Sequence, residues 1–200
     1  MLQIPEGDFE GYVFDCDGTL VDSMPLHFVA WVESFKRHEA PYAEAFTEEF
    51  FYTQAGISEV DTVKSLNAQH GADVDPHSVM RVKMEIFYER LPEIKEVRPV
   101  AEIARQLHGK KPIAVASGSE EETVRRCLEA TGLLPLFDVI ITPKDVKRGK
   151  PAPDMFLLAA ERLGVNPARC LVFEDGQSGI QGARAAGMDV VFVPQGIGRA

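Results

Sequence analysis

Residues 11–19 read Gly-Tyr-Val-Phe-Asp-Cys-Asp-Gly-Thr, a short apolar run that ends at the acid Asp15. An apolar run of this length bounded by a polar group is typical of a buried strand. Asp17 follows two residues later, and Gly18 permits a turn there because glycine adopts backbone conformations that other residues avoid. The stretch therefore predicts the first strand of a sheet, with two carboxylates at its carboxyl end.

Apolar runs and helical patterns alternate regularly after Pro99. The expected strands are 112–117, 138–142, 171–174 and 189–193, and the expected helices are 100–107, 119–130, 154–163 and 179–186. Ser119 and Glu122 have the spacing of a capping box, which would open helix 119–130. Strands that alternate with helices of about ten residues are typical of a parallel sheet with helices on both faces.

Only helical patterns occupy the segment from Pro25 to Arg90, where apolar residues recur at helical spacing. One strand, then a helical block, then a run of strand–helix units is the order that an insertion produces. We therefore predict an α/β fold with two parts. A Rossmann-like parallel sheet core would comprise residues 1–21 and 99–200, and an inserted all-helical cap domain would comprise residues 22–98.

The composition excludes several classes of protein. The 200 residues are 45% hydrophobic and 26% charged, with 21 basic and 31 acidic residues and a net charge of −10. This apolar content argues against disorder, and the negative charge argues against nucleic acid as a partner. No apolar run approaches the roughly 18 residues of a membrane span, and Met1 to Glu10 carries acids where a signal peptide carries bases. We expect a cytoplasmic protein that binds neither nucleic acid nor membrane.

The three cysteines, Cys16, Cys127 and Cys170, are too few and too scattered for a disulfide framework. No Cys-x-x-Cys pair or cluster of cysteine with histidine suggests a zinc site. We expect all three to be reduced, small residues of the core.

Polar side chains follow the predicted strands, at the edge where open parallel sheets bind their ligands. They are Asp15 and Asp17 after the first strand, Ser117 and Gly118 after the second, Lys150 after the third, and Glu174 and Asp175 at the end of the fourth. Two carboxylates about 4 Å apart repel by on the order of 4 kcal/mol at an effective dielectric constant of 20. Such a group needs raised pKa values or a cation, and oxygen donors without histidine or cysteine favour Mg²⁺.

The segment Phe14–Ser23 resembles the first motif of the haloacid dehalogenase superfamily of phosphatases and phosphomutases. Ser117 resembles its second motif, Lys150 in Gly-Lys-Pro-Ala-Pro-Asp its third, and Glu174-Asp175, followed by the segment 178–187, its fourth. The resemblance extends from about residue 10 to 194. It is nearest to the β-phosphoglucomutase-like branch, which includes small bacterial fructose-1-phosphate phosphatases and carries a helical lid in the same place.

The resemblance implies a role for each of these residues. Asp15 would attack phosphorus and form an aspartyl-phosphate, and Asp17 would protonate the leaving group and then activate water. Ser117 would bind a phosphoryl oxygen, the alternative being that it only caps the following helix. Lys150 would neutralise charge on the phosphoryl group and the nucleophile, the alternative being a solvated loop lysine. Mg²⁺ would be held by Asp15, the backbone carbonyl of Asp17, Asp175 and Glu174, the last directly or through water.

In the resembled branch, residues of the first lid helix face the active site, so His27 and Trp31 become candidate substrate-binding residues. A core tryptophan beside a hydrogen-bonded histidine is the open alternative. Gly56 lies in a loop that carries specificity contacts in related enzymes, and Gly118 is the fourth candidate.

Glu59 is a departure from the resembled branch. β-Phosphoglucomutases carry an arginine here that grips the second phosphate of a bisphosphate intermediate, and a glutamate would repel that phosphate. Arg81 and Lys83 could partly substitute from the next helix, although a solvated helix face is the interpretation that we favour for both. The departure favours a phosphatase over a mutase.

We therefore predict a Mg²⁺-dependent phosphatase that hydrolyses a small sugar phosphate or related phosphometabolite through an aspartyl-phosphate. A sugar phosphomutase of the β-phosphoglucomutase type is the alternative with the same chemistry. A non-catalytic Mg²⁺-binding phospho-receiver module is a third reading, against which Lys150 and the lid argue. A monomer is expected, because the lid must open and close.

Overall fold

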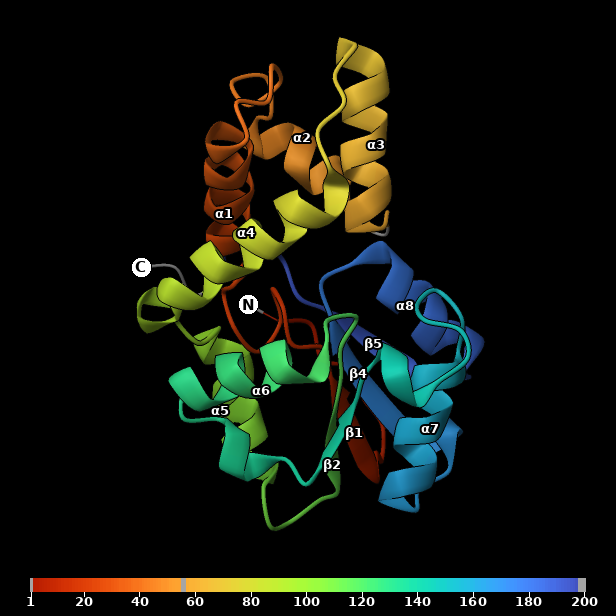
Figure 1. Ribbon diagram of the computed structural model, residues 1–200. Helices are drawn as coiled ribbons and strands as arrows, with labels where there is room; N and C mark the ends of the chain where they lie inside the picture. Colours follow the sequence, from red (N-terminus) through yellow and green to blue (C-terminus); the bar gives the residue numbers. More distant parts are fainter. Residues whose placement is uncertain (1, 55–56, 198–200) are drawn as a thin grey trace. The chain divides into compact units, whose positions relative to one another are not determined.

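The protein, described by a computed structural model for residues 2–54 and 57–197, divides into two compact units. The core unit comprises Met1–Ser23 and Ile94–Ala200, and the helical unit comprises Met24–Glu93. In Figure 1 the core unit contains every labelled strand, and the helical unit contains the helices α1 to α4. That residues 22–98 form a separate cap domain stays a prediction.

A parallel sheet forms the centre of the core unit. Its strands are β1 (Gly11–Phe14), β2 (Ile113–Ala116), β3 (Val139–Ile141), β4 (Cys170–Glu174) and β5 (Asp189–Phe192). They lie in the order β3-β2-β1-β4-β5, with Phe14 of β1 opposite Val115 of β2 and Phe173 of β4. β1 is therefore the central strand, and the predicted α/β fold with a parallel sheet is confirmed.

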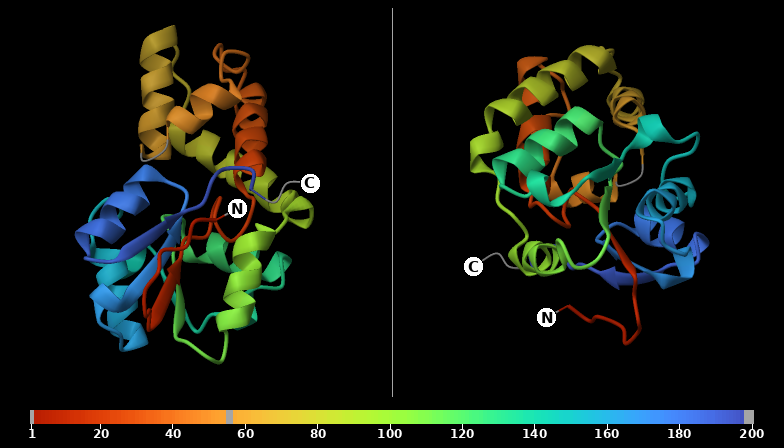
Figure 2. Two further views of the ribbon diagram at one scale, coloured as in Figure 1. Left: turned by 180° about the vertical axis from the view of Figure 1, so that it is seen from behind. Right: turned by 90° about the horizontal axis from the view of Figure 1, so that it is seen from below.

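Helices cover both faces of this sheet, as the opposite views of Figures 1 and 2 show. On one face lie α5 (Arg98–Leu107) and α6 (Glu121–Ala130), and on the other lie α7 (Asp154–Leu163) and α8 (Gln177–Ala185). Short 3₁₀ helices occupy Leu134–Leu136, Pro143–Asp145 and Pro167–Arg169. Right-handed crossovers produce this arrangement when strands are added first to one side of β1 and then to the other.

Apolar side chains fill the space between the sheet and its helices. On one face, Val13 of β1 and Val172 of β4 belong to a buried cluster with Phe156 of α7. On the other face, the ring of Phe14 stacks on that of Phe173, with their centroids 4.9 Å apart. All five side chains are fully buried, as strands covered on both faces require.

The predicted capping box at the start of α6 is wrong. The helix begins at Glu121 after the N-cap residue Glu120, and no side chain caps it. The hydroxyl of Ser119, expected to pair with Glu122 in the box, donates instead to the carboxylate of Asp17. This short tertiary hydrogen bond, at 2.6 Å, engages the hydroxyl that the cap would need.

The helical unit comprises α1 (Met24–Arg37), α2 (Glu48–Thr53), α3 (Glu59–His70), α4 (Pro76–Glu89) and a 3₁₀ turn at Leu91–Glu93. Side chains of Ser58 and Asp75 cap the first turns of α3 and α4, and Gly71 ends α3 in the left-handed conformation. Buried rings, including Phe35 and Tyr42, form the core of this unit. Its predicted helical character is confirmed. Among the described helices, none has the length and apolarity that a membrane span requires.

The chain segments that leave and re-enter the core unit pair with each other. Val21 and Glu96 form an isolated antiparallel bridge. The amide of Asp22 donates to the carbonyl of Lys95 at 2.8 Å, and the amide of Val97 donates to the carbonyl of Leu20 at 2.8 Å. We call these bonds the connecting ladder. They fix both ends of the insertion within the core unit.

The three cysteines are free and buried, as expected. Burial raises the pKa of the Cys170 thiol to about 11. It also raises the pKa values of Cys16 and Cys127 well above the usual range for a thiol, with further contributions from nearby carboxylates. All three are therefore neutral thiols near pH 7.

Replacing Phe14 with alanine should lower the free energy of unfolding by about 3–5 kcal/mol, because it leaves a cavity under the central strand. Urea unfolding followed by circular dichroism measures this change. Phe192→Ala is the matched control, since Phe192 lies on β5 with 52% of its surface exposed. Its removal should change the free energy by less than about 0.5 kcal/mol. Equal losses from both variants would contradict the assignment of Phe14 to the core.

Candidate active site

The carboxyl ends of β1, β2 and β4 bring the predicted polar residues to one edge of the sheet. Asp15 follows β1 directly, and its amide donates to the carbonyl of Phe173 in β4 at 2.9 Å. Ser117 follows β2, and Glu174 is the last residue of β4. Because these three strands are adjacent and parallel, their ends place the side chains side by side.

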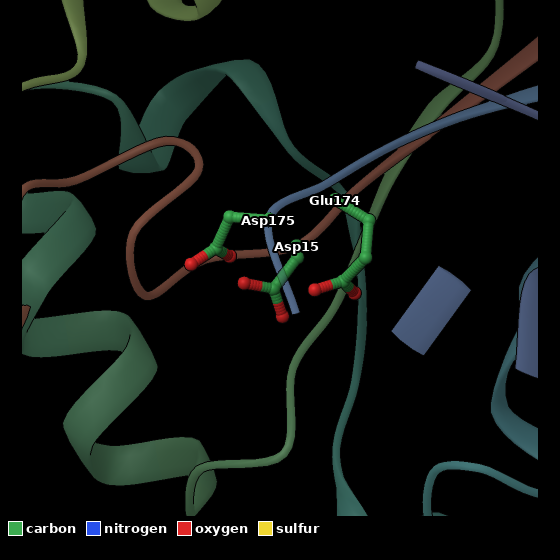
Figure 3. A group of neighbouring side chains, drawn as sticks. All are labelled: Asp15, Glu174 and Asp175. Carbon is green, nitrogen blue, oxygen red and sulfur yellow. The ribbon is translucent and has the colours of Figure 1, made fainter. Parts of the chain in front are cut away.

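Three carboxylates form one tight group at this edge. Oxygen atoms of Asp15, Glu174 and Asp175 all lie within 4.8 Å of one another. Figure 3 shows the three groups turned toward each other, with Asp15 between the other two. Asp15 and Glu174 are buried, at 5% and 3% exposure, so water screens their repulsion weakly.

Lys150, from the loop before α7, supplies the positive charge within this group. Its Nζ lies 2.6 Å from Oδ1 of Asp15 and 2.6 Å from Oε2 of Glu174. Burial alone would lower the pKa of Lys150, but the charges of the two carboxylates and their hydrogen bonds raise it above its usual value. Lys150 is therefore an ammonium group, and the alternative of a solvated loop lysine is wrong.

The pKa values of Asp15 and Asp175 are both raised although the ammonium of Lys150 opposes the shift. Burial, followed by the charge of Glu174, raises the pKa of Asp15 well above its usual range, against the opposing effect of Lys150. The same two causes raise the pKa of Asp175 to about 7, although a hydrogen bond from Thr19 opposes them. Ionising both Asp15 and Asp175 at this edge therefore calls for further positive charge.

The donor set fits a hard divalent cation. Carboxylate oxygens from Asp15, Glu174 and Asp175 form the group, and hard ions such as Mg²⁺ prefer oxygen ligands. A cation at this position would offset the repulsion that raises the pKa values of Asp15 and Asp175.

Backbone and hydroxyl groups orient the carboxylates. The amide of Gly176 donates to Oε1 of Glu174 at 2.9 Å, and the hydroxyl of Thr19 donates to Oδ1 of Asp175 at 3.0 Å. A Cβ atom on Gly179 would overlap the carboxylate of Glu174, and one on Gly18 would overlap that of Asp175. Gly18 also has a φ of 85°, which turns the chain after Asp17 as predicted.

Asp17 has different surroundings from Asp15. Its Oδ1 accepts a hydrogen bond from the hydroxyl of Ser23 at 2.6 Å, and its Oδ2 accepts one from Ser119 at 2.6 Å. The hydroxyl of Ser117 lies 3.4 Å from the same Oδ2. Asp15 thus contacts a lysine and lies beside two carboxylates, whereas Asp17 contacts hydroxyl groups. The predicted roles, Asp15 as nucleophile and Asp17 as acid–base, require such a difference in surroundings.

Sequence reasoning did not identify Ser23 and Ser119 as neighbours of Asp17. The available signal was the spacing of Ser117 and Ser119, which puts both side chains on one side of an extended segment. A serine before a helix has a commoner explanation as a cap, so this spacing was not decisive.

The predicted substrate-binding residues have varied surroundings. His27 stacks on Phe87 within the helical unit, with ring centroids 4.0 Å apart. Trp31 is only 4% exposed and belongs to the buried cluster of that unit. Gly118 is exposed in the loop after β2, and Gly56 lies outside the described residues. Substrate binding by these four residues stays a prediction.

The interpretation of Lys83 as part of a solvated helix face is wrong. Lys83 is 1% exposed, and its Nζ lies 2.5 Å from Oε1 of Glu59 and 5.5 Å from the ring centroid of Trp31. Arg81 is exposed and pairs with Glu85 of the same helix, as a solvated face predicts. Lys83 is buried because its ammonium has a partner in Glu59.

A sequence profile of haloacid dehalogenase-like hydrolases matches residues 9–187 of the chain. The chain belongs to this family. The match covers all four segments that build the edge of the sheet, so the haloacid dehalogenase-like assignment and the site geometry rest on the same residues.

Individual relatives of this haloacid dehalogenase-like hydrolase include two named enzymes. The chain is 38% identical to the fructose-1-phosphate phosphatase YqaB of Escherichia coli, over 92% of the chain and 96% of that protein. It is 28% identical to the β-phosphoglucomutase of Bacillus subtilis, over 92% of the chain and 83% of that protein. The solved structure of CbbY from Rhodobacter sphaeroides in complex with phosphate is similar at a TM-score of 0.78. It is 26% identical, covering 91% of the chain and 84% of that structure.

Gly179→Ala should weaken the binding of Mg²⁺ by about ten- to a hundredfold, because the added methyl group displaces Glu174 from the carboxylate group. Isothermal titration with MgCl₂ measures this change. Gly149→Ala is the matched control, since a Cβ atom there meets nothing within 4 Å. An affinity for Mg²⁺ that is unchanged in Gly179→Ala would show that Glu174 has no part in the cation site.

Proposed function

We propose that this chain is a Mg²⁺-dependent phosphatase that hydrolyses a small sugar phosphate or related phosphometabolite through an aspartyl-phosphate on Asp15. The observation that carries the proposal is the position of Asp15, which lies between two further carboxylates and within 2.6 Å of Lys150. A carboxylate so placed has a cationic partner for the negative charge of an incoming phosphoryl group. The 38% identity to a fructose-1-phosphate phosphatase supports the same chemistry.

In the proposed first step, a carboxylate oxygen of Asp15 attacks phosphorus and the bond to the sugar oxygen breaks. Asp17 gives its proton to that leaving oxygen. Lys150 neutralises charge on the nucleophile and the phosphoryl group, and Ser117 donates a hydrogen bond to a phosphoryl oxygen.

In the second step, water attacks phosphorus while the bond to Asp15 breaks. Asp17 takes a proton from the water and returns to its starting state, and phosphate leaves. Asp15, Asp175, the backbone carbonyl of Asp17 and Glu174 would hold Mg²⁺, which when bound supplies positive charge for the phosphoryl oxygens. Both oxygens of Glu174 already accept hydrogen bonds, from Gly176 and Lys150, which favours its contact with the ion through water.

The pairing of Glu59 with Lys83 favours a phosphatase over a mutase. A mutase must hold a second phosphate while the first is transferred, and this needs free positive charge. The ammonium of Lys83 is buried and neutralised by Glu59 at 2.5 Å. We propose His27, Trp31, Gly56 and Gly118 as contacts to the substrate.

Asp15→Asn should abolish phosphate release from a panel that includes fructose 1-phosphate and β-glucose 1-phosphate, because an amide is a far weaker nucleophile than a carboxylate. The expected loss is at least about a thousandfold, measured as inorganic phosphate, with Asp138→Asn as the control at an exposed aspartate. Persistent activity would rule out Asp15 as the nucleophile. Formation of glucose 6-phosphate from β-glucose 1-phosphate with a bisphosphate activator would favour the mutase instead.

Removing divalent ions with a chelator should abolish activity, and added MgCl₂ should restore it, because the carboxylates need a cation to stay ionised around the phosphoryl group. Phosphate release measured along a MgCl₂ titration tests this, with circular dichroism to confirm that the chelated protein stays folded. Full activity in excess chelator would exclude a metal-dependent reaction.

A further inference from the structure

The carboxylate of Asp17 is held from two sides by hydroxyl groups. Ser23 donates to Oδ1 and Ser119 donates to Oδ2, each at 2.6 Å. Ser23 is fully buried and Ser119 is partly buried, and all three residues belong to the core unit. A hydroxyl group can both donate and accept, so contacts on opposite oxygens hold the plane of the Asp17 carboxyl group whether or not it carries the proton.

This restraint matters because the terminal torsion of an aspartate is broad and does not by itself fix the carboxylate. An acid–base group must lie within hydrogen-bond reach of the proton that it transfers. Side chains that fix the plane of Asp17 therefore influence the rate of proton transfer without contacting the substrate.

Ser117 and Ser119, both in the loop after β2, make different contacts. The amide of Ser119 donates to the hydroxyl oxygen of Ser117 at 3.1 Å, which fixes the loop. Ser119 then makes the short bond to Asp17, while Ser117 stays 3.4 Å from the same oxygen. Ser117 is thereby the serine that is more available to a phosphoryl group, and Ser119 is committed to Asp17.

The start of α6 also indicates that the hydroxyl of Ser119 serves Asp17 and not the helix. Ser119 precedes the N-cap residue Glu120, and no side chain caps the helix. The hydroxyl of Ser119 therefore has no part in stabilising the first turn of α6, and its strong contact is the one with Asp17.

We propose that Ser119 is a positioning residue that orients Asp17 for proton transfer, an inference that rests on the proposed phosphatase function. When Asp15 attacks phosphorus and the bond to the leaving oxygen breaks, the electron pair of that bond goes to the leaving oxygen. Asp17 delivers the proton to it, and Ser119 holds Asp17 in place. Ser23 holds the other carboxylate oxygen.

The proposal separates substrates by their leaving group. The alcohol of a sugar is a poor leaving group and needs the proton from Asp17, whereas p-nitrophenolate is a stable anion that leaves without it. Loss of the hydroxyl of Ser119 should therefore slow the first step with a sugar phosphate and leave the first step with p-nitrophenyl phosphate nearly unchanged.

The experiment measures the first turnover with the Mg²⁺-loaded enzyme in excess over fructose 1-phosphate or p-nitrophenyl phosphate. Release of fructose or of p-nitrophenol reports the first step alone. Ser119→Ala should slow fructose release by about tenfold or more, a part of the roughly 10²–10⁴ that acid–base catalysis contributes. Its release of p-nitrophenol should stay within about twofold of the wild type. Ser119→Thr keeps a hydroxyl and should retain most of the rate of fructose release.

Two results would overturn the inference alone. An equal loss with both substrates would mean that Ser119 acts on the phosphoryl group or on folding, and no loss with either would mean that Asp17 does not need it. Thermal unfolding of Ser119→Ala checks that the variant is folded. If the wild type released neither product, the proposed function would be wrong and the inference would fall with it.

Discussion

Three carboxylates repel one another at the end of the parallel sheet, and the arrangement of the neighbouring residues depends on this repulsion. Asp15 and Glu174 are buried beside Asp175, where water does little to separate their charges. The ammonium group of Lys150 offsets part of this repulsion because it pairs with both buried carboxylates. Breaking such a pair leaves an uncompensated buried charge, which costs more than an exposed ion pair contributes.

The remainder of the site follows from the same constraint. Glu174 and Asp175 need space, and the glycines at 179 and 18 provide it because they carry no side chain. The hydroxyl of Thr19 and the amide of Gly176 then fix the directions of the two carboxylates. An apolar replacement of such a group often stabilises a protein, so its presence argues for chemistry rather than for stability.

Most of the fold and the main site residues could be predicted because both depend on local patterns. Short apolar runs that end in acids identify the strands, and parallel strands bring their carboxyl ends together whatever the helices do. The same reasoning placed Lys150 at the sheet edge, because its loop follows a strand. It could not place Ser119 on Asp17, since a capping pattern describes neighbours in sequence and the acceptor lies 102 residues away. Lys83 was missed for the same reason, because its partner Glu59 belongs to another helix.

The connecting ladder between Leu20–Asp22 and Lys95–Val97 has a consequence for how such proteins diversify. The hydrogen bonds of the connecting ladder hold the two ends of the insertion together. They thereby offset the entropy that is lost when the ends of that loop are brought together. The cost of closure then grows only slowly with the length of what is inserted, by about 0.6 kcal/mol for each doubling. The register of β1 is set by β2 and β4 within the core unit and not by the length of Met24–Glu93. A longer or shorter insertion would thus change the free energy of loop closure by little and would leave the strand ends that carry Asp15 and Glu174 in place.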